Sequence, residues 1–137
     1  MVSILSNVLI DLLDAKHNDE DNSVMDEIRR RVKSDKIDKT VNTEKQNRHI
    51  RGTREYVEGR SYLFDDVNPQ ELVDKYHGTG FMPINGRGEW KSVETVSTEE
   101  DIGVEVNPDT MTKTPTNRFT IHYSKTGTHV VPSERRT

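Results

Sequence analysis

The sequence has no cysteine and is poor in apolar and aromatic residues. The absence of cysteine excludes a disulfide framework, a cysteine-ligated zinc site and a thiol nucleophile. Leu, Ile, Val and Phe account for 31 of the 137 residues, only slightly more than the roughly 20% below which a charged chain is expected to stay disordered. We therefore expect one compact domain plus an N-terminal appendage, with part of the chain loosely held.

Long apolar runs are also missing. No stretch approaches the roughly 18 apolar residues needed to span a bilayer, and the N-terminus lacks the basic segment and small-residue cleavage site of a signal peptide. Residues 2–13 have the apolar spacing of a helix, but its polar face is acidic and does not suit an anionic membrane. The sequence predicts a soluble protein with no membrane partner and no signal peptide.

The net charge of −4 hides an uneven distribution along the chain. Acids outnumber bases in residues 1–44, with a net charge of −3, and above all in residues 64–112, with −8. Bases outnumber acids in residues 45–63, with +3, and in residues 113–137, with +4. Because phosphate binding is driven by Lys and Arg, the two basic segments are the candidates for contact with a nucleic acid.

The spacing of apolar residues changes from helical to alternating along the chain. Helical spacing and capping signals predict helices over residues 1–15, from Ser23 to about Lys39, over Thr43–Ile50 with Thr43 as the N-cap, and from Asn68-Pro69 to Gly78. Alternation predicts strands at Ser61–Phe64, Val93–Val96 and Ile102–Val106, and in a final hairpin of residues 119–131. We predict an α+β fold in which N-terminal helices precede an antiparallel sheet of about four strands, with a helical arm at 1–42 and the main domain at 43–137.

The first basic segment contains a lysine and a histidine at helical spacing. On the helix predicted there, Lys45 and His49 are four residues apart and share one face. The lysine would lower the pKa of the imidazole and keep it available as a base beside a phosphate. The same spacing also suits an ordinary solvated helix end.

The final hairpin carries two more histidines, and its register depends on the turn. A two-residue turn at Thr126-Gly127 pairs Ser124 with His129, and the polar face then consists of Thr120, His122, Ser124 and His129. A three-residue bulged turn instead places His129 beside Tyr123. Either way, the residues could also be ordinary half-exposed strand residues.

Acidic and glycine-rich stretches provide no further site. The carboxylates of Asp65-Asp66 and Glu99–Asp101 lack the spacing of a known metal loop. Gly78-Thr79-Gly80 lacks the lysine, strand and helix of a phosphate-binding loop. We expect no metal and no cofactor.

Four short motifs, taken in order, resemble one family. They are Lys45-Gln46-x-x-His49-Ile50-x-Gly52-Thr53, then Gly59-Arg60-Ser61, then Gln70-Glu71-Leu72 with Gly78-Thr79-Gly80, and finally Phe119–Lys125 with Gly127 and His129–Pro132. Together they closely resemble the bacterial polymorphic toxin type 50 domain. The resemblance covers roughly residues 40–133 and implies a predicted ribonuclease of the barnase–EndoU–colicin–RelE-like superfamily, which occurs in secreted toxins and in some phage minor head proteins.

The resemblance implies a metal-independent endoribonuclease that cleaves RNA by attack of the 2′-hydroxyl and leaves a 2′,3′-cyclic phosphate. Such cleavage needs a base, an acid and a cation beside the phosphate. We expect His49 and His129 to be the acid/base pair and Lys45 the cation, with Tyr123 and Thr120 completing the catalytic set. The expected substrate-binding residues are Gln46, Arg48, Arg51, Thr53, Arg60, Ser61, Arg118, His122, Ser124 and Lys125.

The setting of this activity leaves several hypotheses open. As a toxin, the protein would act on RNA, tRNA being one candidate, in the bacterial cytoplasm, with an immunity protein as partner. As a phage-encoded binding protein, it would use the same fold without turnover and contact a phage structural partner. In a third hypothesis, the acidic residues 1–44 cover the basic groove or form a homodimer through the first helix.

Overall fold

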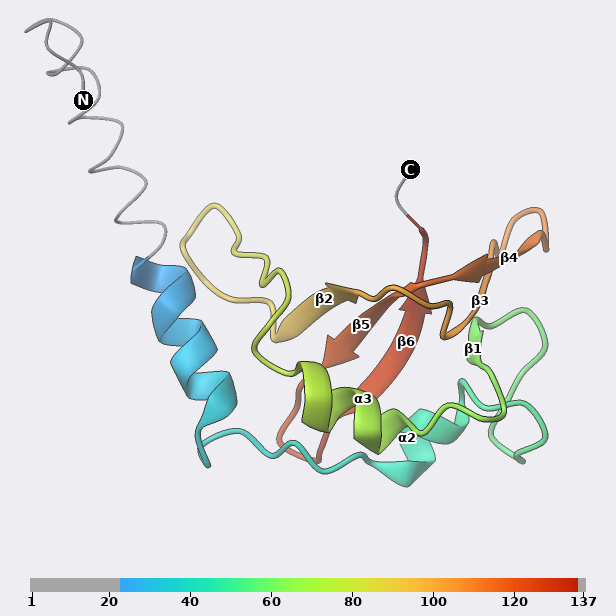
Figure 1. The fold of residues 1–137 in the computed structure, drawn as a ribbon, viewed down its shortest axis with the longest axis horizontal. Helices are drawn as coiled ribbons and strands as arrows, with labels where there is room; N and C mark the ends of the chain where they lie inside the picture. Colours follow the sequence, from blue (N-terminus) through green and yellow to red (C-terminus); the bar gives the residue numbers. More distant parts are fainter. Residues whose placement is uncertain (1–22, 136–137) are drawn as a thin grey trace, which may run out of the picture.

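Two small antiparallel sheets form the β part of the fold. In the computed structural model, which describes residues 23–135, the first sheet has the order β2-β5-β6 (Figure 1), with strands at Val93–Ser97, Arg118–His122 and His129–Ser133. The second has the order β1-β3-β4, with strands at Tyr62–Leu63, Gly103–Val106 and Lys113–Thr116. The α+β fold is confirmed, but its strands are divided between two sheets rather than joined in one sheet of about four. The helix predicted for residues 1–15 lies outside the described residues.

Strand β4 is the strand that the alternation pattern missed. It contains Pro115, which pairs with Val104 of β3. A proline usually counts against a strand because it has no N–H to donate. Here β4 is an edge strand, so this N–H is not needed on the open side.

The first described helix covers residues 23–33 and is drawn in blue in Figure 1. It ends about six residues before the predicted end near Lys39. The Ser34 hydroxyl donates to the Arg31 carbonyl at 2.7 Å, and the Lys39 ammonium donates to the Ser34 carbonyl at 2.6 Å. These side chains take up carbonyls at the helix end that have no partner within the helix.

Helix α2, Thr43–Asn47, begins and ends earlier than predicted. Its N-cap is Asn42 rather than Thr43, and the Asn42 side chain accepts from the Lys45 N–H at 3.0 Å. After Asn47 the N–H groups of Arg48 and His49 bond to carbonyls three residues back, so the chain continues as a tighter turn. His49 therefore lies in this turn and not on the helix itself.

Helix α3, Pro69–Tyr76, agrees with the prediction. The Asn68 side chain caps it by accepting from the N–H groups of Gln70 and Glu71, and Pro69 occupies the first turn. Gly78 follows with a φ of +81°, a left-handed conformation that glycine adopts without strain. An N-cap asparagine before proline is a strong local signal, which is why the sequence located this helix correctly.

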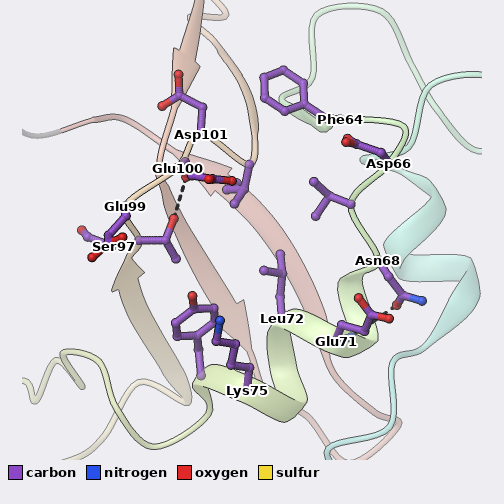
Figure 2. Close-up of a pocket in the computed structure, with 14 residues that line it drawn as sticks. Phe64, Asp66, Asn68, Glu71, Leu72, Lys75, Ser97, Glu99, Glu100 and Asp101 are labelled. Atoms are coloured by element: carbon purple, nitrogen blue, oxygen red, sulfur yellow. Dashed lines mark hydrogen bonds between the residues drawn. The ribbon is translucent and has the colours of Figure 1, made fainter.

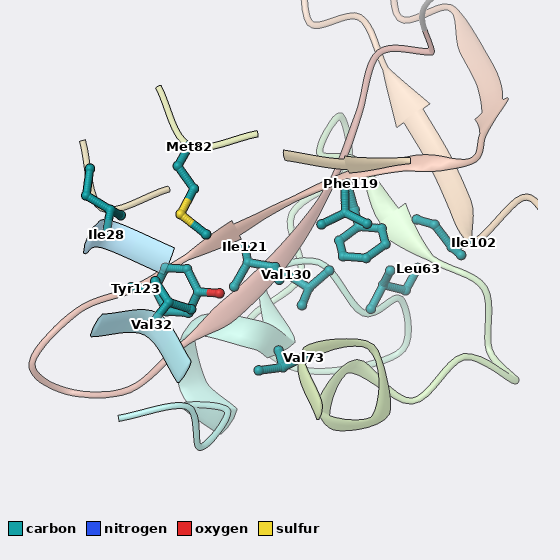
Figure 3. Close-up of a cluster of buried hydrophobic side chains, with 11 residues drawn as sticks. Ile28, Val32, Leu63, Val73, Met82, Ile102, Phe119, Ile121, Tyr123 and Val130 are labelled. Carbon is teal, nitrogen blue, oxygen red and sulfur yellow. The ribbon is translucent and has the colours of Figure 1, made fainter. Parts of the chain in front are cut away.

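The core lies on one face of the β2-β5-β6 sheet (Figure 3). Phe119, Ile121 and Val130 point from the sheet toward Val32 of the first helix and Val73 of α3, and all five side chains are fully buried. The alternate residues of β5 and β6 are half-buried and lie on the opposite face. This division of the hairpin into an apolar and a polar face is the one that the alternation predicted.

The register of the hairpin differs from both predicted pairings. His122 pairs with His129, which leaves six residues in the connection. Thr128 donates its N–H to Thr40 and accepts from the N–H of Asn42, at 2.9 and 2.8 Å. Because residues 40–42 take up these backbone groups, the hairpin cannot close with a two- or three-residue turn. The shift from the two-residue register is two residues, so the faces are unchanged.

Two glutamine side chains take the place of missing strand partners. The Gln46 amide donates to the Val130 carbonyl at 2.8 Å and accepts from the Val130 N–H at 2.7 Å, joining α2 to β6. The Gln70 amide accepts from the Val41 N–H at 2.8 Å and donates to the Lys39 carbonyl at 3.0 Å. Gln46 is 1% exposed, whereas Gln70 is only partly buried.

The difference in burial leads to a stability prediction. Gln46→Leu leaves two backbone groups of Val130 unpaired away from water, and should lower the free energy of unfolding by about 2–5 kcal/mol. The matched variant Gln70→Leu should cost about 1 kcal/mol, because water can reach the groups that it frees. Urea denaturation followed by circular dichroism measures both values, and equal losses would contradict the bridging role of Gln46.

Candidate functional site

Three histidine rings lie nearly parallel at one end of the β2-β5-β6 sheet. The ring centroids of His122 and His129 are 4.7 Å apart, those of His49 and His129 are 6.1 Å apart, and both pairs have an interplanar angle of 12°. His129 is thus the middle ring of a stack that we call the histidine cluster. The structure brings together the two predicted catalytic histidines and adds His122 as their neighbour.

Contacts between β5, β6 and α2 position the cluster. His122 ends β5 and His129 begins β6, and their direct pairing places both rings on the polar face of the sheet. His49 follows α2, which the Gln46 amide holds against Val130, the residue after His129. Residues 49 and 129 are far apart in sequence, and this buried amide is one of the contacts that bring their rings together.

The orientation of the His49 ring is set by a main-chain carbonyl. Its Nδ1 donates to the Ser61 carbonyl at 2.9 Å, and the His49 carbonyl accepts from the Leu63 N–H at 3.0 Å. Ser61 is itself held, because its hydroxyl accepts from the Val106 N–H at 3.0 Å. The carbonyl can only accept, so the His49 proton at Nδ1 is fixed and Nε2 remains to exchange a proton.

The electrostatic surroundings of the cluster are cationic. Burial lowers the pKa of all three imidazoles, and that of His129 to about 4. For His129 the further cause is the positive charge of His122, His49, Lys45 and Arg48. For His49 the Ser61 carbonyl raises the pKa, while Arg60, His122 and Arg48 lower it. Every charged group that shifts these two pKa values is thus a cation.

Lys45 lies beside the hairpin loop rather than beside His49. Its ammonium donates to the hydroxyls of Ser124 at 3.0 Å and Thr126 at 2.7 Å. The sequence predicted that Lys45 would lower the pKa of His49, but the lysine acts on His129, and the arginines at 48 and 60 act on His49. Both partners of the ammonium are neutral hydroxyls, so its positive charge is available to an anion.

Several predicted binding residues hold the fold together instead of facing the cluster. The Gln46 amide makes both of its hydrogen bonds to the backbone of Val130. The Thr53 hydroxyl donates to the Asn47 and Ile50 carbonyls and closes the turn after α2. The Ser61 hydroxyl binds Val106, and only its carbonyl meets a cluster residue. The Arg51 guanidinium stacks 4.0 Å above the Tyr62 ring, in a cation–π contact.

The two remaining catalytic candidates are separated from the cluster. Tyr123 is buried on the core face, where its hydroxyl donates to the buried carboxylate of Glu94 at 2.7 Å. Burial and that carboxylate raise the Tyr123 pKa. Tyr123, predicted as a member of the catalytic set, thus follows β5 on the core face, whereas His122 lies on the opposite, polar face. Thr120 is on the histidine face and shares a 2.8 Å hydrogen bond with Ser133.

Two other predicted binding residues occupy the ends of the hairpin. Arg118 begins β5 and pairs with Ser133, at the far end of the strand from His122. Lys125 is exposed in the loop that follows β5. Arg118 thus shares the polar face of the cluster, and Lys125 shares the loop between its two hairpin histidines.

A cleft of about 1020 Å³ lies elsewhere, between α3 and the segment joining β2 to β3 (Figure 2). Figure 2 shows Glu99, Glu100 and Asp101 on one wall and Asp66 and Glu71 on the other. None of the predicted site residues lines this cleft. Its carboxylates would repel a phosphate backbone, so we place the candidate site at the histidine cluster and not in this cleft.

Within 23–135, no three His, Cys, Asp or Glu side chains come together in a way that could hold a metal ion. No helix in that part of the chain is both long and apolar enough to cross a membrane.

The fold and site define a small α+β domain with a histidine cluster in cationic surroundings at one end of a sheet. A family model described as Bacterial toxin 50 matches residues 41–132, which is more than half of the chain. The chain belongs to this family of bacterial toxin domains. None of the curated proteins matches it.

Sequence reasoning found the three histidines but missed what orients them. The partner of the His49 ring is a main-chain carbonyl, and every residue has one, so no residue type signals it. The role of Gln46 was equally hidden, because its partner is the backbone of Val130. Burial was the missing information in both cases.

The lowered pKa values predict a specific pH dependence of stability. A histidine with a lowered pKa resists protonation when folded, so the unfolded chain binds more protons and stability falls as the pH drops from about 6.5 to about 4. His129→Phe keeps a stacked ring that does not titrate, and should flatten this decline. Urea denaturation at pH 7, 5.5 and 4.5 measures it, and an unchanged difference between pH 7 and pH 4.5 would contradict the assignment.

Proposed function

We propose that this toxin domain is an endoribonuclease whose active site is the histidine cluster. The observation that carries the proposal is that three imidazoles are stacked together. The charges of Lys45, Arg48 and Arg60 act on them. Imidazoles transfer protons near neutral pH, and cations attract a phosphodiester. Together they supply what cleavage of RNA by its own 2′-hydroxyl requires.

The reaction needs two proton transfers and one site for negative charge. A base removes the proton of the 2′-hydroxyl, and the oxygen attacks the adjacent phosphorus. The bond to the 5′-oxygen breaks, and an acid supplies the proton that this oxygen needs on leaving. The products are a 2′,3′-cyclic phosphate and a 5′-hydroxyl. His49 and His129 take the proton-transfer roles, and Lys45 stabilises the charge that builds up on the phosphorane oxygens.

The surrounding cations give a path for the rest of the RNA. Arg48 and Arg60 adjoin His49, while Arg118 begins β5 and Lys125 lies in the loop that follows it. His122, Ser124 and Thr120 complete the polar surface between them. Contacts between these residues and the phosphates would give affinity for RNA without specificity for its sequence.

The central test is cleavage of labelled tRNA and total RNA by the purified chain in excess EDTA. We expect products with 2′,3′-cyclic phosphate ends. His49→Ala and His129→Ala should each lower the rate by about a hundred- to ten-thousandfold, the range of a lost acid or base. His77→Ala is the matched control, because the Nδ1 of this histidine also bonds to a main-chain carbonyl, that of Val73, but it lies at the end of α3.

Each outcome distinguishes between hypotheses. Absence of cleavage together with tight RNA binding would replace the nuclease by a binding protein of the same fold. Cleavage that requires a divalent ion would overturn the metal-independent mechanism. Growth gives a parallel measure: expression of the active protein in the bacterial cytoplasm should be toxic, and His49→Ala should relieve the toxicity.

Lys45 has a separate prediction. Lys45→Ala removes the cation beside the reacting phosphate and should lower kcat by about a hundred- to a thousandfold, as does the loss of one group that stabilises an oxyanion. Lys36→Ala removes the same charge from an exposed position outside the site and should leave kcat unchanged. Steady-state kinetics on one RNA substrate compare the two variants. An equal, small loss in both would show that Lys45 contributes only to the overall charge.

A further inference from the structure

We propose that the two histidines have distinct roles: His129 is the base that accepts the 2′-hydroxyl proton, and His49 is the acid that protonates the departing 5′-oxygen. This assignment rests on the proposed endoribonuclease function. It is carried by two geometric differences between the rings, namely their hydrogen-bond partners and their places in the stack.

The first difference is the partner of the His49 ring. Nδ1 of His49 donates to the Ser61 carbonyl at 2.9 Å. When Nε2 is also protonated, that hydrogen bond becomes charge-assisted and stabilises the imidazolium. No carbonyl in the described part of the chain holds a ring nitrogen of His122 or His129 in this way. His49 is therefore the cluster residue best suited to carry the proton before the reaction.

The second difference is the position of His129 between two other rings. Its centroid lies 4.7 Å from His122 and 6.1 Å from His49. A proton on the middle ring meets like charge on both sides, and Lys45 and Arg48 from the end of α2 add to it. With a pKa of about 4, His129 is neutral in the free enzyme near neutral pH. A neutral ring can take a proton, as a base must.

The substrate supplies the charge that makes this base effective. A bound phosphodiester is an anion and raises the pKa of every imidazole near it. The working pKa of His129 in the complex is therefore higher than in the free enzyme and closer to neutral, where general-base catalysis is most efficient. The imidazolium that forms on His129 is then stabilised by the same phosphate that reacts.

His122 acts as a positioning residue in this scheme. It stacks on His129, and its ring is not needed for either proton transfer. Its positive charge is one of the causes that keep the pKa of His129 low. His122→Asn removes this charge, so the acidic limb of the pH profile of kcat/KM should move to higher pH. A purely structural role would lower the rate at all pH values without moving that limb.

A substrate with a better leaving group separates the acid from the base. In an RNA oligonucleotide whose 5′-bridging oxygen at the mapped cleavage site is replaced by sulfur, the leaving thiolate needs no proton. His49→Ala should be about a hundred- to ten-thousandfold slower than wild type on the oxygen substrate, but within about tenfold of wild type on the sulfur substrate. His129→Ala should lose a similar factor on both, because the 2′-hydroxyl proton must still be removed.

The possible results decide the assignment. Recovery of His129→Ala instead of His49→Ala on the sulfur substrate would reverse the roles, and recovery of both variants or of neither would overturn the division into acid and base. A wild-type protein that cleaves neither substrate overturns the nuclease function itself. Recovery of His49→Ala also shows that this variant is folded. For His129, the variant His129→Gln and thermal melting of both variants separate a lost base from a lost fold.

Discussion

The end of this domain that holds the histidine cluster depends on one buried side-chain amide. Gln46 meets both backbone groups of Val130, so the edge of β6 is closed by a side chain where a strand would otherwise be needed. An unpaired N–H or C=O in this dry position would cost about 1–3 kcal/mol. The same contact fixes the turn after α2, and it thereby places His49 next to His129. The contact that closes the edge of the sheet thus also helps to assemble the cluster.

Charge is separated across the fold in a way that the net value conceals. The basic residues adjoin the histidine cluster, while the carboxylates of the acidic segment line the cleft between α3 and the β2–β3 connection (Figure 2). An approaching polyanion is therefore repelled from the cleft and drawn toward the cluster. A chain with a net charge of −4 can in this way still have a cationic surface around the cluster.

Local signals in the sequence were sufficient for α3 and for the two faces of β5, but not for the register of the hairpin. Asn68 and Pro69 fix α3 through neighbouring atoms, and alternation along β5 separates Ile121 from His122. The pairing of His122 with His129 depends on Thr128 bonding to residues 40–42, which are far away in sequence. The two sheets, rather than one, depend likewise on β4, whose Pro115 argues against a strand unless its edge position is known. What the sequence missed in both cases was the tertiary surroundings of a segment, which local residue patterns do not contain.

The histidine cluster stacks three imidazoles beside several cations, an arrangement that resists protonation. In a domain without substrate this resistance makes the fold less stable in acid. A phosphate bound at the cluster would reduce the repulsion between a protonated histidine and the nearby cations, because it provides the negative charge that the surroundings lack. Under the proposed nuclease function, substrate binding and proton uptake are therefore linked, since each favours the other. If the cluster is the active site that we propose, the arrangement that weakens the free protein in acid is the one that makes a phosphodiester its preferred ligand.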